Sequence, residues 1–370
     1  MDWSTPGRID DFEFIKIAPN ALGTSKGTIK GVVGGRLTFD YDSELKVSGS
    51  LDVVNTNFTN GCLIRIKYVV KQNNSAKTEK FTLCTCYADT TEMKYENGQW
   101  NGTINLRSVL ARYIDDQITR NWVFQSGSSA IKHFKNTFSW LGGAYTIKSN
   151  VKDKKYPYTS KGKKKNVVHK MGTSPMEVLN SIAKFLSCEI TCDNYGRTVL
   201  QKKIAPKYKA VSKPIPSGDL SVTLPGLTKE DTVAGTVNRV VVLYSYKKSG
   251  KTETLRSVAS VVKTHRASYT NQGRYVTKTY TLNTMSPQTQ KRIDEIAKNY
   301  LIKDSAITKY WKFTCFYVPI TDICLKGGVV QFVYGSLKID AQVVSVDMDL
   351  APGGKLEVTL KEVRRNGGSL

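Results

Sequence analysis

Histidine is the side chain that most often transfers protons near neutral pH, and this chain has three, His133, His169 and His265. None lies in a His-Glu-x-x-His pair or beside a Gly-x-Ser-x-Gly elbow, the spacings that place histidine on a metal or next to a nucleophilic serine. His169 adjoins a lysine-rich segment and His265 lies in a strand-like run, so we expect both on the surface. The histidines therefore do not indicate an active site.

A second candidate for chemistry is the triplet Gly250, Lys251 and Thr252, which matches the end of a phosphate-binding loop. The first glycine of that motif would fall at Ser245, which is not a glycine. A phosphate-binding loop opens a helix, whereas the segments on both sides of this triplet have the composition of strands. We therefore predict a hairpin turn here.

The seven cysteines are an odd number and lack the spacing of a disulfide framework, which fits a protein folded in a reducing cytosol. No pair has the two-residue separation of a zinc knuckle, so we expect buried, unreactive thiols. The pairs closest in sequence are Cys84 with Cys86, Cys188 with Cys192, and Cys315 with Cys324.

Paired carboxylates could cleave glycans, but this reaction needs two acids about 5 to 9 Å apart across a cleft. The neighbouring acids Asp115 and Asp116, and likewise Glu230 and Asp231, would point apart on regular structure. We therefore expect no catalytic residues, no metal site and no cofactor, and we predict that the protein is not an enzyme.

The most unusual property is charge, with 55 Lys and Arg against 31 Asp and Glu, a net +24. Such a field attracts polyanions, including nucleic acid, anionic membranes and acidic proteins. Many basic residues alternate singly with apolar ones, as in 64–68 (IRIKY), which is typical of a solvated sheet face. We therefore expect the charge to be spread evenly.

The densest basic segment is a loop or linker at 152–165, with seven lysines and two tyrosines. Lysine with aromatic residues is the mixture that neutralises phosphates and stacks on bases. The alternative is a loop kept soluble by its charge, which we favour because the aromatics are few and no nucleic-acid module surrounds them. The candidate contacts for DNA, without sequence specificity, are Lys152, Lys154, Lys155, Tyr156, Tyr158, Lys161, Lys163, Lys164 and Lys165.

The elements around these residues are mostly strands, since 19 Tyr and 12 Phe with frequent Thr and Val suit a pleated sheet. In the N-terminal third we expect paired strands at 63–70 and 81–87. Apolar residues at three- and four-residue steps predict a helix over 104–118. A second helix should run over 129–140 and end at Gly142-Gly143.

The most specific local pattern begins at Ser174, with Pro175 at the first helical position and Glu177 three residues after the cap. An apolar face follows as far as Leu186. Strands at 188–191 and 198–201 flank a turn of Asp, Asn, Tyr and Gly. We therefore predict a compact helix–hairpin unit over 174–201.

The last third returns to strands. We expect a hairpin of 239–246 with 252–262, a strand at 274–282, and a helix that opens at Ser286-Pro287. The four closing strands are predicted at 310–318, 329–334, 336–348, with a bend or bulge, and 355–363.

These elements predict a mainly β chain with α+β inserts. The predicted ranges are an N-terminal barrel-like domain (1–150), a lysine-rich linker (151–170), a helix–hairpin insert with a proline-rich connection (171–233), and a C-terminal barrel-like domain (234–370). No run approaches the roughly 18 apolar residues of a membrane span, and no apolar leader follows Met1.

Three segments resemble the hub proteins at the tail tip or baseplate of tailed phages. Residues 7–14 (GRIDDFEF) resemble their first strand, and 174–201 resembles their short helix with a strand pair around Asp-x-x-Gly. The end resembles their closing strands: 327–332 (GGVVQF), 341–350 (AQVVSVDMDL) and 352–360 (PGGKLEVTL).

This resemblance implies two tail-tube-like β-barrel domains with inserted domains, and a homotrimeric ring at the distal end of the tail. Its partners would be the tail tube or distal tail protein, the tape-measure protein, and a spike or fibre protein. The protein would be made in the host cytoplasm and end in the virion. Two alternatives stay open, another β-rich virion assembly component such as a distal tail or adaptor protein, and a basic nucleic-acid-binding protein.

Overall fold

The computed structural model describes residues 8–56, 58, 62–72, 78–158, 166–203, 212–215, 223–233, 235–248, 251–284 and 288–363. The chain divides into two compact units. Unit 1 comprises Met1–Leu227 and Lys312–Val363, and unit 2 comprises Thr228–Trp311 with Arg364–Leu370. Unit 2 is thus inserted between two parts of unit 1, a division that differs from the predicted domain range 234–370.

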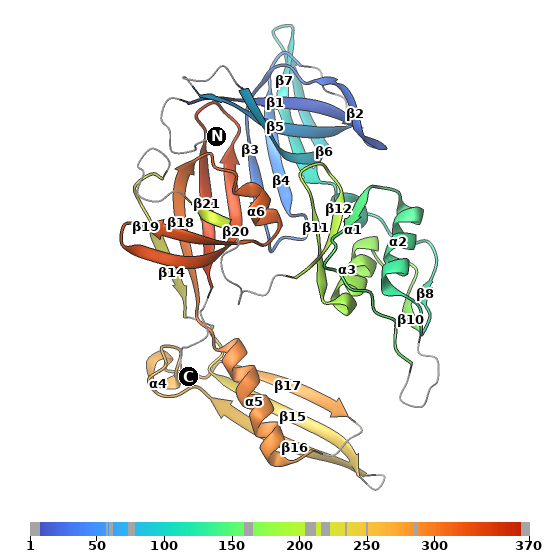
Figure 1. The fold of residues 1–370 in the computed structure, drawn as a ribbon, viewed down its shortest axis with the longest axis vertical. Coiled ribbons are helices and arrows are strands. Elements are labelled where there is room, and N and C mark those ends of the chain that lie inside the picture. Colours follow the sequence, from blue (N-terminus) through green and yellow to red (C-terminus); the bar gives the residue numbers. More distant parts are fainter. Residues whose placement is uncertain are drawn as a thin grey trace. The chain divides into compact units, whose positions relative to one another are not determined.

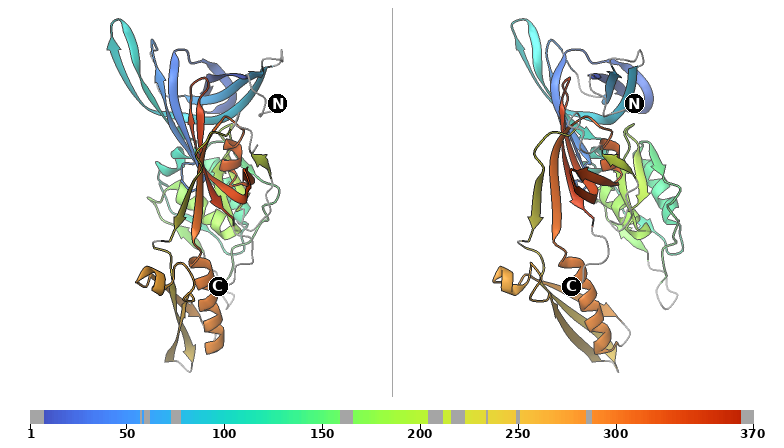
Figure 2. Two further views of the ribbon diagram at one scale, coloured as in Figure 1. Left: turned by 90° about the vertical axis from the view of Figure 1, so that its left-hand side faces the viewer. Right: turned by 60° about the vertical axis from the view of Figure 1, so that its left-hand side comes forward.

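Unit 1 is organised around one large sheet of N- and C-terminal strands (Figures 1 and 2). The part of its order that lies in unit 1 is β18-β21-β20-β3-β4-β7-β6-β5-β1-β2, with β19 paired to β20 and to β13 (Ser212–Ile215). The mainly β prediction is confirmed, while the described strands form an open order rather than two separate closed barrels. The bounds are β1 Arg8–Ala18, β2 Ala21–Thr28, β3 Val32–Asp40, β4 Val47–Val53, β5 Leu63–Gln72, β6 Thr78–Glu96, β7 Gln99–Ser108, β18 Thr308–Phe316, β19 Val329–Tyr334, β20 Leu337–Asp349 and β21 Lys355–Glu362.

The two ends of the chain meet where β3 pairs with β20 in antiparallel register, from Ser345 opposite Asp40 to Asp349 opposite Arg36. Leu37 and Phe39 of β3 are fully buried there, because alternate side chains of a strand share one face. The predicted bend in β20 is confirmed as a register shift between Val343 and Ser345 against β21.

The paired strands expected in the N-terminal third are confirmed as β5 and β6, with Leu63 opposite Tyr87 and Ile66 opposite Cys84. The helix predicted over 104–118 is wrong. Its first residues finish β7, where Ile104 and Leu106 alternate with more exposed residues and pair with β4, and only α1 (Ala111–Ile114) is helical. The pairing of β7 with a strand on each side makes this segment a strand. The spacing of its apolar side chains in the sequence could not reveal that pairing.

A helix–strand module lies between β7 and the C-terminal strands of unit 1. Its helices α2 (Ala130–Leu141) and α3 (Pro175–Leu186) confirm both predictions, with Ser129 and Ser174 as N-caps. Gly142 follows α2 at a positive φ of 67°, which glycine adopts without strain. The strands are β8 Trp122–Phe124, β9 Tyr145–Ile147, β10 Val167–His169, β11 Cys188–Cys192 and β12 Thr198–Lys202.

The β11–β12 turn attaches this module to the large sheet. Asn194 Nδ2 donates to the Thr82 carbonyl (2.9 Å), and Thr85 Oγ1 donates to the Asn194 carbonyl (2.9 Å). Gly196, at a φ of 84°, lies so close to Thr85 that a Cβ there would be 3.2 Å from its side chain. Two short elements complete the described part of unit 1, β13 (Ser212–Ile215) and α6 (Thr321–Leu325).

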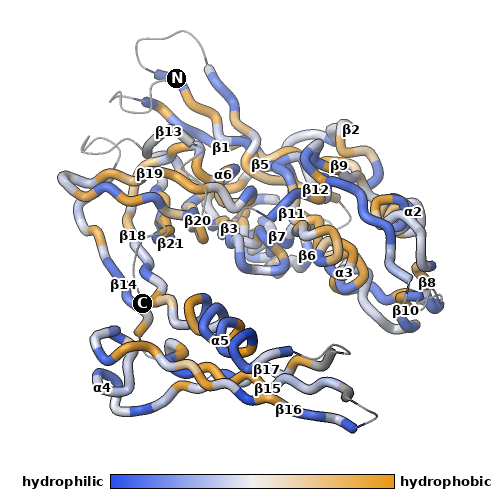
Figure 3. The backbone as a smooth tube through the Cα atoms, turned by 60° about the horizontal axis from the view of Figure 1, so that its bottom comes forward, coloured by the Kyte–Doolittle hydropathy of each residue, from blue (hydrophilic) through white to orange (hydrophobic). Residues whose placement is uncertain are grey.

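Unit 2 is a three-stranded sheet covered on one face by a helix (Figures 1 and 3). The order is β16-β15-β17, with β15 antiparallel to β16 and parallel to β17. Val240, Val242 and Tyr244 of β15 pack against Ile293 and Leu301. The predicted hairpin is confirmed, while the helix begins after Thr289. The bounds are β14 Thr228–Thr232, β15 Arg239–Lys248, β16 Lys251–Ser260, α4 Tyr269–Gln272, β17 Thr277–Thr284 and α5 Gln290–Asp304.

Candidate assembly and polyanion-binding surfaces

The structure describes the start of the predicted polyanion-binding loop, 152–158, and the rest of the loop lies outside the described residues. Tyr156 is only 3% exposed, and its ring stacks on Phe185 at 4.5 Å with the ring planes 11° apart. Burial raises the pKa of its hydroxyl to about 12. A base could stack on Tyr156 only after this packing was broken, so Tyr156 belongs to the core of the module, whereas Tyr158 is 53% exposed.

The charged residues at the start of the loop hold the two helices of the module. Asp153 accepts the backbone N–H of Ile131 (3.0 Å) at the N-terminus of α2. Lys154 Nζ donates to the Phe185 carbonyl (3.2 Å) at the end of α3, where the helix dipole favours a cation. Of the other candidates, Lys152 and Lys155 are exposed. Lys161, Lys163, Lys164 and Lys165 lie outside the described residues.

The net charge is concentrated in two segments of the chain, which corrects the expectation of an even spread. Residues 112–203 contain 17 Lys and Arg against 6 Asp and Glu, a net +11. Residues 228–311 contain 15 against 6, a net +9. Residues 1–111 and 312–370, which supply most of the strands of the large sheet, contain 20 against 18, a net +2. The two inserted modules therefore carry most of the net positive charge of the protein.

Two of the histidines are half-buried in the helix–strand module. His133 stacks on Phe124 at 4.2 Å and shares a 2.7 Å hydrogen bond with Ser128, and the ring of His169 lies 5.0 Å from that of Phe124. Burial lowers the pKa of both imidazoles below the ordinary value. His169, which was expected on the surface, is half-buried, and its Nε2 is buried.

The remaining sequence candidates are structural. All seven cysteines are buried, as expected. Lys248 of β15 pairs with Lys251 of β16, so the predicted hairpin is confirmed, while Gly250 itself lies outside the described residues. Asp115 accepts from Arg107 (2.7 Å) and Asp231 from Arg266 (2.7 Å). In the described ranges, no group of His, Cys, Asp and Glu could hold a metal ion. No helix there is both long and apolar enough to cross a membrane.

Other exposed features of unit 1 were not predicted. The hairpin of β6 and β7 extends beyond the neighbouring strands (Figure 2), and its end carries Tyr95 and Trp100 with ring centroids 5.1 Å apart. On the inserted module, the guanidinium of Arg120 lies 3.5 Å from the ring centroid of Trp140, which is 63% exposed. Trp, Tyr and Arg are the residues that dominate protein interfaces.

The terminal strand β2 of the large sheet is exposed along most of its length. An exposed outer strand is a site where another chain can add a strand. Sequence reasoning found neither the hairpin end nor this edge, since each depends on how the strands are arranged in the sheet.

Searches with the sequence alone find no matching protein family and no matching curated protein. The three-dimensional structure, in contrast, matches solved structures of phage tail proteins. A tail protein from Neisseria meningitidis aligns over 96% of this chain and 97% of that chain, with a TM-score of 0.58 and 11% identity. The 43 kDa tail protein of prophage MuSo2 from Shewanella oneidensis aligns over 94% and 98%, with a TM-score of 0.56 and 13% identity.

This chain has the fold of a phage tail protein. The tail-protein fold also occurs in a Francisella PdpA-VgrG complex, where the match covers 98% of this chain but 54% of the other, with a TM-score of 0.52 and 9% identity. Because both tail-protein alignments cover nearly all of each chain, the likeness includes unit 1 and the inserted unit 2.

Proposed function

We propose that this protein is a non-enzymatic structural component of a phage tail, and that it acts as the hub at the distal end. Three copies form a ring that links the tail tube or distal tail protein to a spike or fibre and contacts the tape-measure protein. The protein is made in the host cytoplasm and becomes part of the virion at the tail tip.

The observation that carries this proposal is the match to two tail proteins over nearly the whole of each chain. The distribution of charge also supports it. Residues 1–111 and 312–370, which supply most strands of the large sheet, have a net charge of only +2, so copies of these strands can pack side by side with little mutual repulsion. The outer strand β2 and the aromatic end of the β6–β7 hairpin supply surfaces that a closed ring would bury.

The test is the oligomeric state and its symmetry. One chain has a mass of 41.2 kDa, so a trimer would have three times this mass, about 124 kDa, by size-exclusion chromatography with light scattering. Electron microscopy of the same fraction should show rings with threefold symmetry. A monomer at every concentration up to the solubility limit would contradict the hub proposal. A stable ring of another symmetry would favour a different tail component, such as a distal tail or adaptor protein.

A second candidate function is nucleic-acid binding, favoured by the net +11 and +9 of the two inserted modules. It predicts a gel shift of short DNA that weakens steeply with salt. Replacement of the lysines of 152–165 by serine should abolish this shift if the loop is the site, and should leave assembly unchanged. Binding that is insensitive to these replacements would exclude the loop as the DNA contact.

A further inference from the structure

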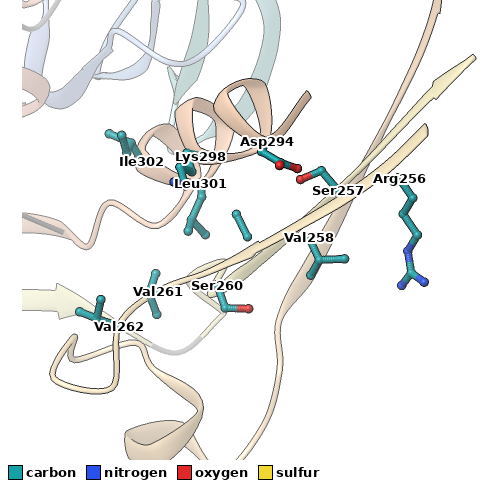
Figure 4. Close-up of a pocket in the computed structure, with 11 residues that line it drawn as sticks. Arg256, Ser257, Val258, Ser260, Val261, Val262, Asp294, Lys298, Leu301 and Ile302 are labelled. Atoms are coloured by element: carbon teal, nitrogen blue, oxygen red, sulfur yellow. The ribbon is translucent and has the colours of Figure 1, made fainter. Parts of the chain in front are cut away.

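A groove runs along the outer edge of unit 2. It has a volume of about 670 Å³ and is lined by seven consecutive residues, 256–262, together with Asp294, Lys298, Leu301 and Ile302 of α5 (Figure 4). Strand β16 ends the sheet order, so one wall is a strand edge and the other is a helix. All these residues belong to unit 2.

The backbone groups of this edge point in a known direction. Val261 N donates to the Asn238 carbonyl (3.0 Å), so its N–H faces the neighbouring strand. Because inward and outward groups alternate along an antiparallel strand, the backbone N–H and C=O of Arg256, Val258 and Ser260 face outward. One hydrogen bond supports this assignment of the outward groups, since Gln290 Nε2 donates to the Arg256 carbonyl (3.0 Å) from the outer side of the strand.

The side chains along the groove alternate as well. Ser257 is turned toward α5, while Arg256 and Val258 are turned to the other face (Figure 4). Val258 is 48% exposed and Ile302, on the helix wall, is 51% exposed. The groove therefore offers the outward backbone groups of β16 along one wall and the apolar side chain of Ile302 on the helix wall. The open face of the strand carries the basic side chain of Arg256. An extended chain recognises such a surface by adding a strand.

We propose that this groove binds an extended segment of another protein, which pairs with β16 as a fourth strand of unit 2. Alternate side chains of the bound segment are apolar, and lie against Leu301 and Ile302. The others are acidic, and lie on the open face beside Arg256. The five groove residues that belong to β16, 256–260, span about 17 Å, so the paired part of the bound segment is about that long.

The net charge of unit 2 indicates which kind of segment binds in the groove. Residues 228–311 have a net charge of +9, and the helix wall of the groove carries Lys298 together with Asp294. Two copies of unit 2 that paired through this edge would bring two such charges together, which costs free energy. An acidic segment gains from the same field. The proposal stands on unit 2 alone and does not depend on the ring proposed above.

The probe is a fluorescein-labelled peptide of sequence TVEIEVT, titrated with the full-length protein and followed by anisotropy. We expect saturable binding, with slower amide hydrogen exchange at Val258 and Ser260 in the complex. Two further peptides carry N-methyl groups on alternate amides. One is methylated at the odd-numbered residues and the other at the even-numbered residues. Strand pairing predicts that only one of these two peptides binds, because only one set of alternate amides donates hydrogen bonds to β16. Equal binding of the two methylated peptides would overturn the proposal, and so would absence of binding.

Variants of the protein test the same contacts. Val258→Pro removes an outward N–H that the fold does not use, and should weaken binding about tenfold while the unfolding temperature stays close to that of the parent. Thr254→Pro is the matched control on the same edge, outside the groove, and should bind normally. Arg256→Glu should weaken TVEIEVT about fivefold and strengthen TVKIKVT. Self-association that Val258→Pro removes would show that a second copy occupies the groove, and would overturn the assignment to another protein.

Discussion

Phe39 of β3 lies directly opposite Val346 of β20, and both side chains are fully buried. This pair joins strands that are about 300 residues apart in the sequence and belong to the two ends of the chain. The large sheet of unit 1 is therefore completed only when the chain on both sides of the inserted unit has been made, and its stability depends on this seam.

We expect Phe39→Ala to lower the free energy of unfolding by about 3 to 5 kcal/mol, since it leaves a cavity where two halves of the sheet meet. Urea unfolding followed by circular dichroism measures this change. Val33→Ala, on the same strand but at a 59% exposed position, is the control and should change stability by less than about 0.5 kcal/mol. Equal losses of stability in the two variants would contradict the conclusion that stability depends on the pairing of β3 with β20.

The hydroxyl of Tyr156 is buried and has no hydrogen-bond partner among the described residues. Tyr156→Phe removes this unsatisfied group and keeps the ring on Phe185, so we expect it to raise the free energy of unfolding by about 1 kcal/mol. Tyr158→Phe, at an exposed position, should have no effect. If Tyr156 instead contacted nucleic acid, Tyr156→Ala would weaken DNA binding without loss of stability, the opposite of what its burial predicts.

The half-buried histidines His133 and His169 predict a loss of stability in mild acid. Burial lowers the pKa of His133 and His169 in the folded state below the unfolded value of about 6.5. The unfolded chain therefore binds more protons as the pH falls through that value. The histidine contribution to stability is complete above it and is lost progressively toward the folded-state pKa.

His133→Phe keeps an aromatic ring beside Phe124 and removes the titrating group. Its free energy of unfolding should fall less than that of the parent between pH 7.5 and 5.5, as measured by urea unfolding at each pH. Carboxylates titrate alike in both proteins, so the difference belongs to His133. Parallel pH curves for the two proteins would contradict this prediction.

The helix of the most specific sequence pattern has a testable cap. Ser174 Oγ accepts the backbone N–H of Glu177 (3.2 Å) at the N-terminus of α3. Ser174→Ala should lower the free energy of unfolding by about 1 kcal/mol in thermal or urea denaturation. Ser139→Ala, at an exposed position inside α2, is the matched control, and a similar loss in both variants would argue against a capping role.

Local patterns predicted the elements that local interactions stabilise. The cap at Ser174, the apolar face of α3 and the hairpin of β15 with β16 depend on residues close in sequence, and each is observed. The prediction of a helix over 104–118 was wrong because the spacing of its apolar residues fits both a helix and a strand. Pairing of Ile104 with Leu51 and of Leu106 with Gly49 selects the strand, and these partners are about 50 residues away.

The sequence by itself determined the β-rich class, the capped helices, the hairpins and the excess of basic residues, because composition and short-range periodicity carry this information. Only the tertiary structure decided that 312–363 complete the sheet of 8–108, that Tyr156 is buried, that the charge belongs to two inserted modules, and that β16 ends its sheet beside α5. The physical reason is that sheet pairing joins backbone groups of distant segments, and backbone hydrogen bonds are the same for almost every residue type.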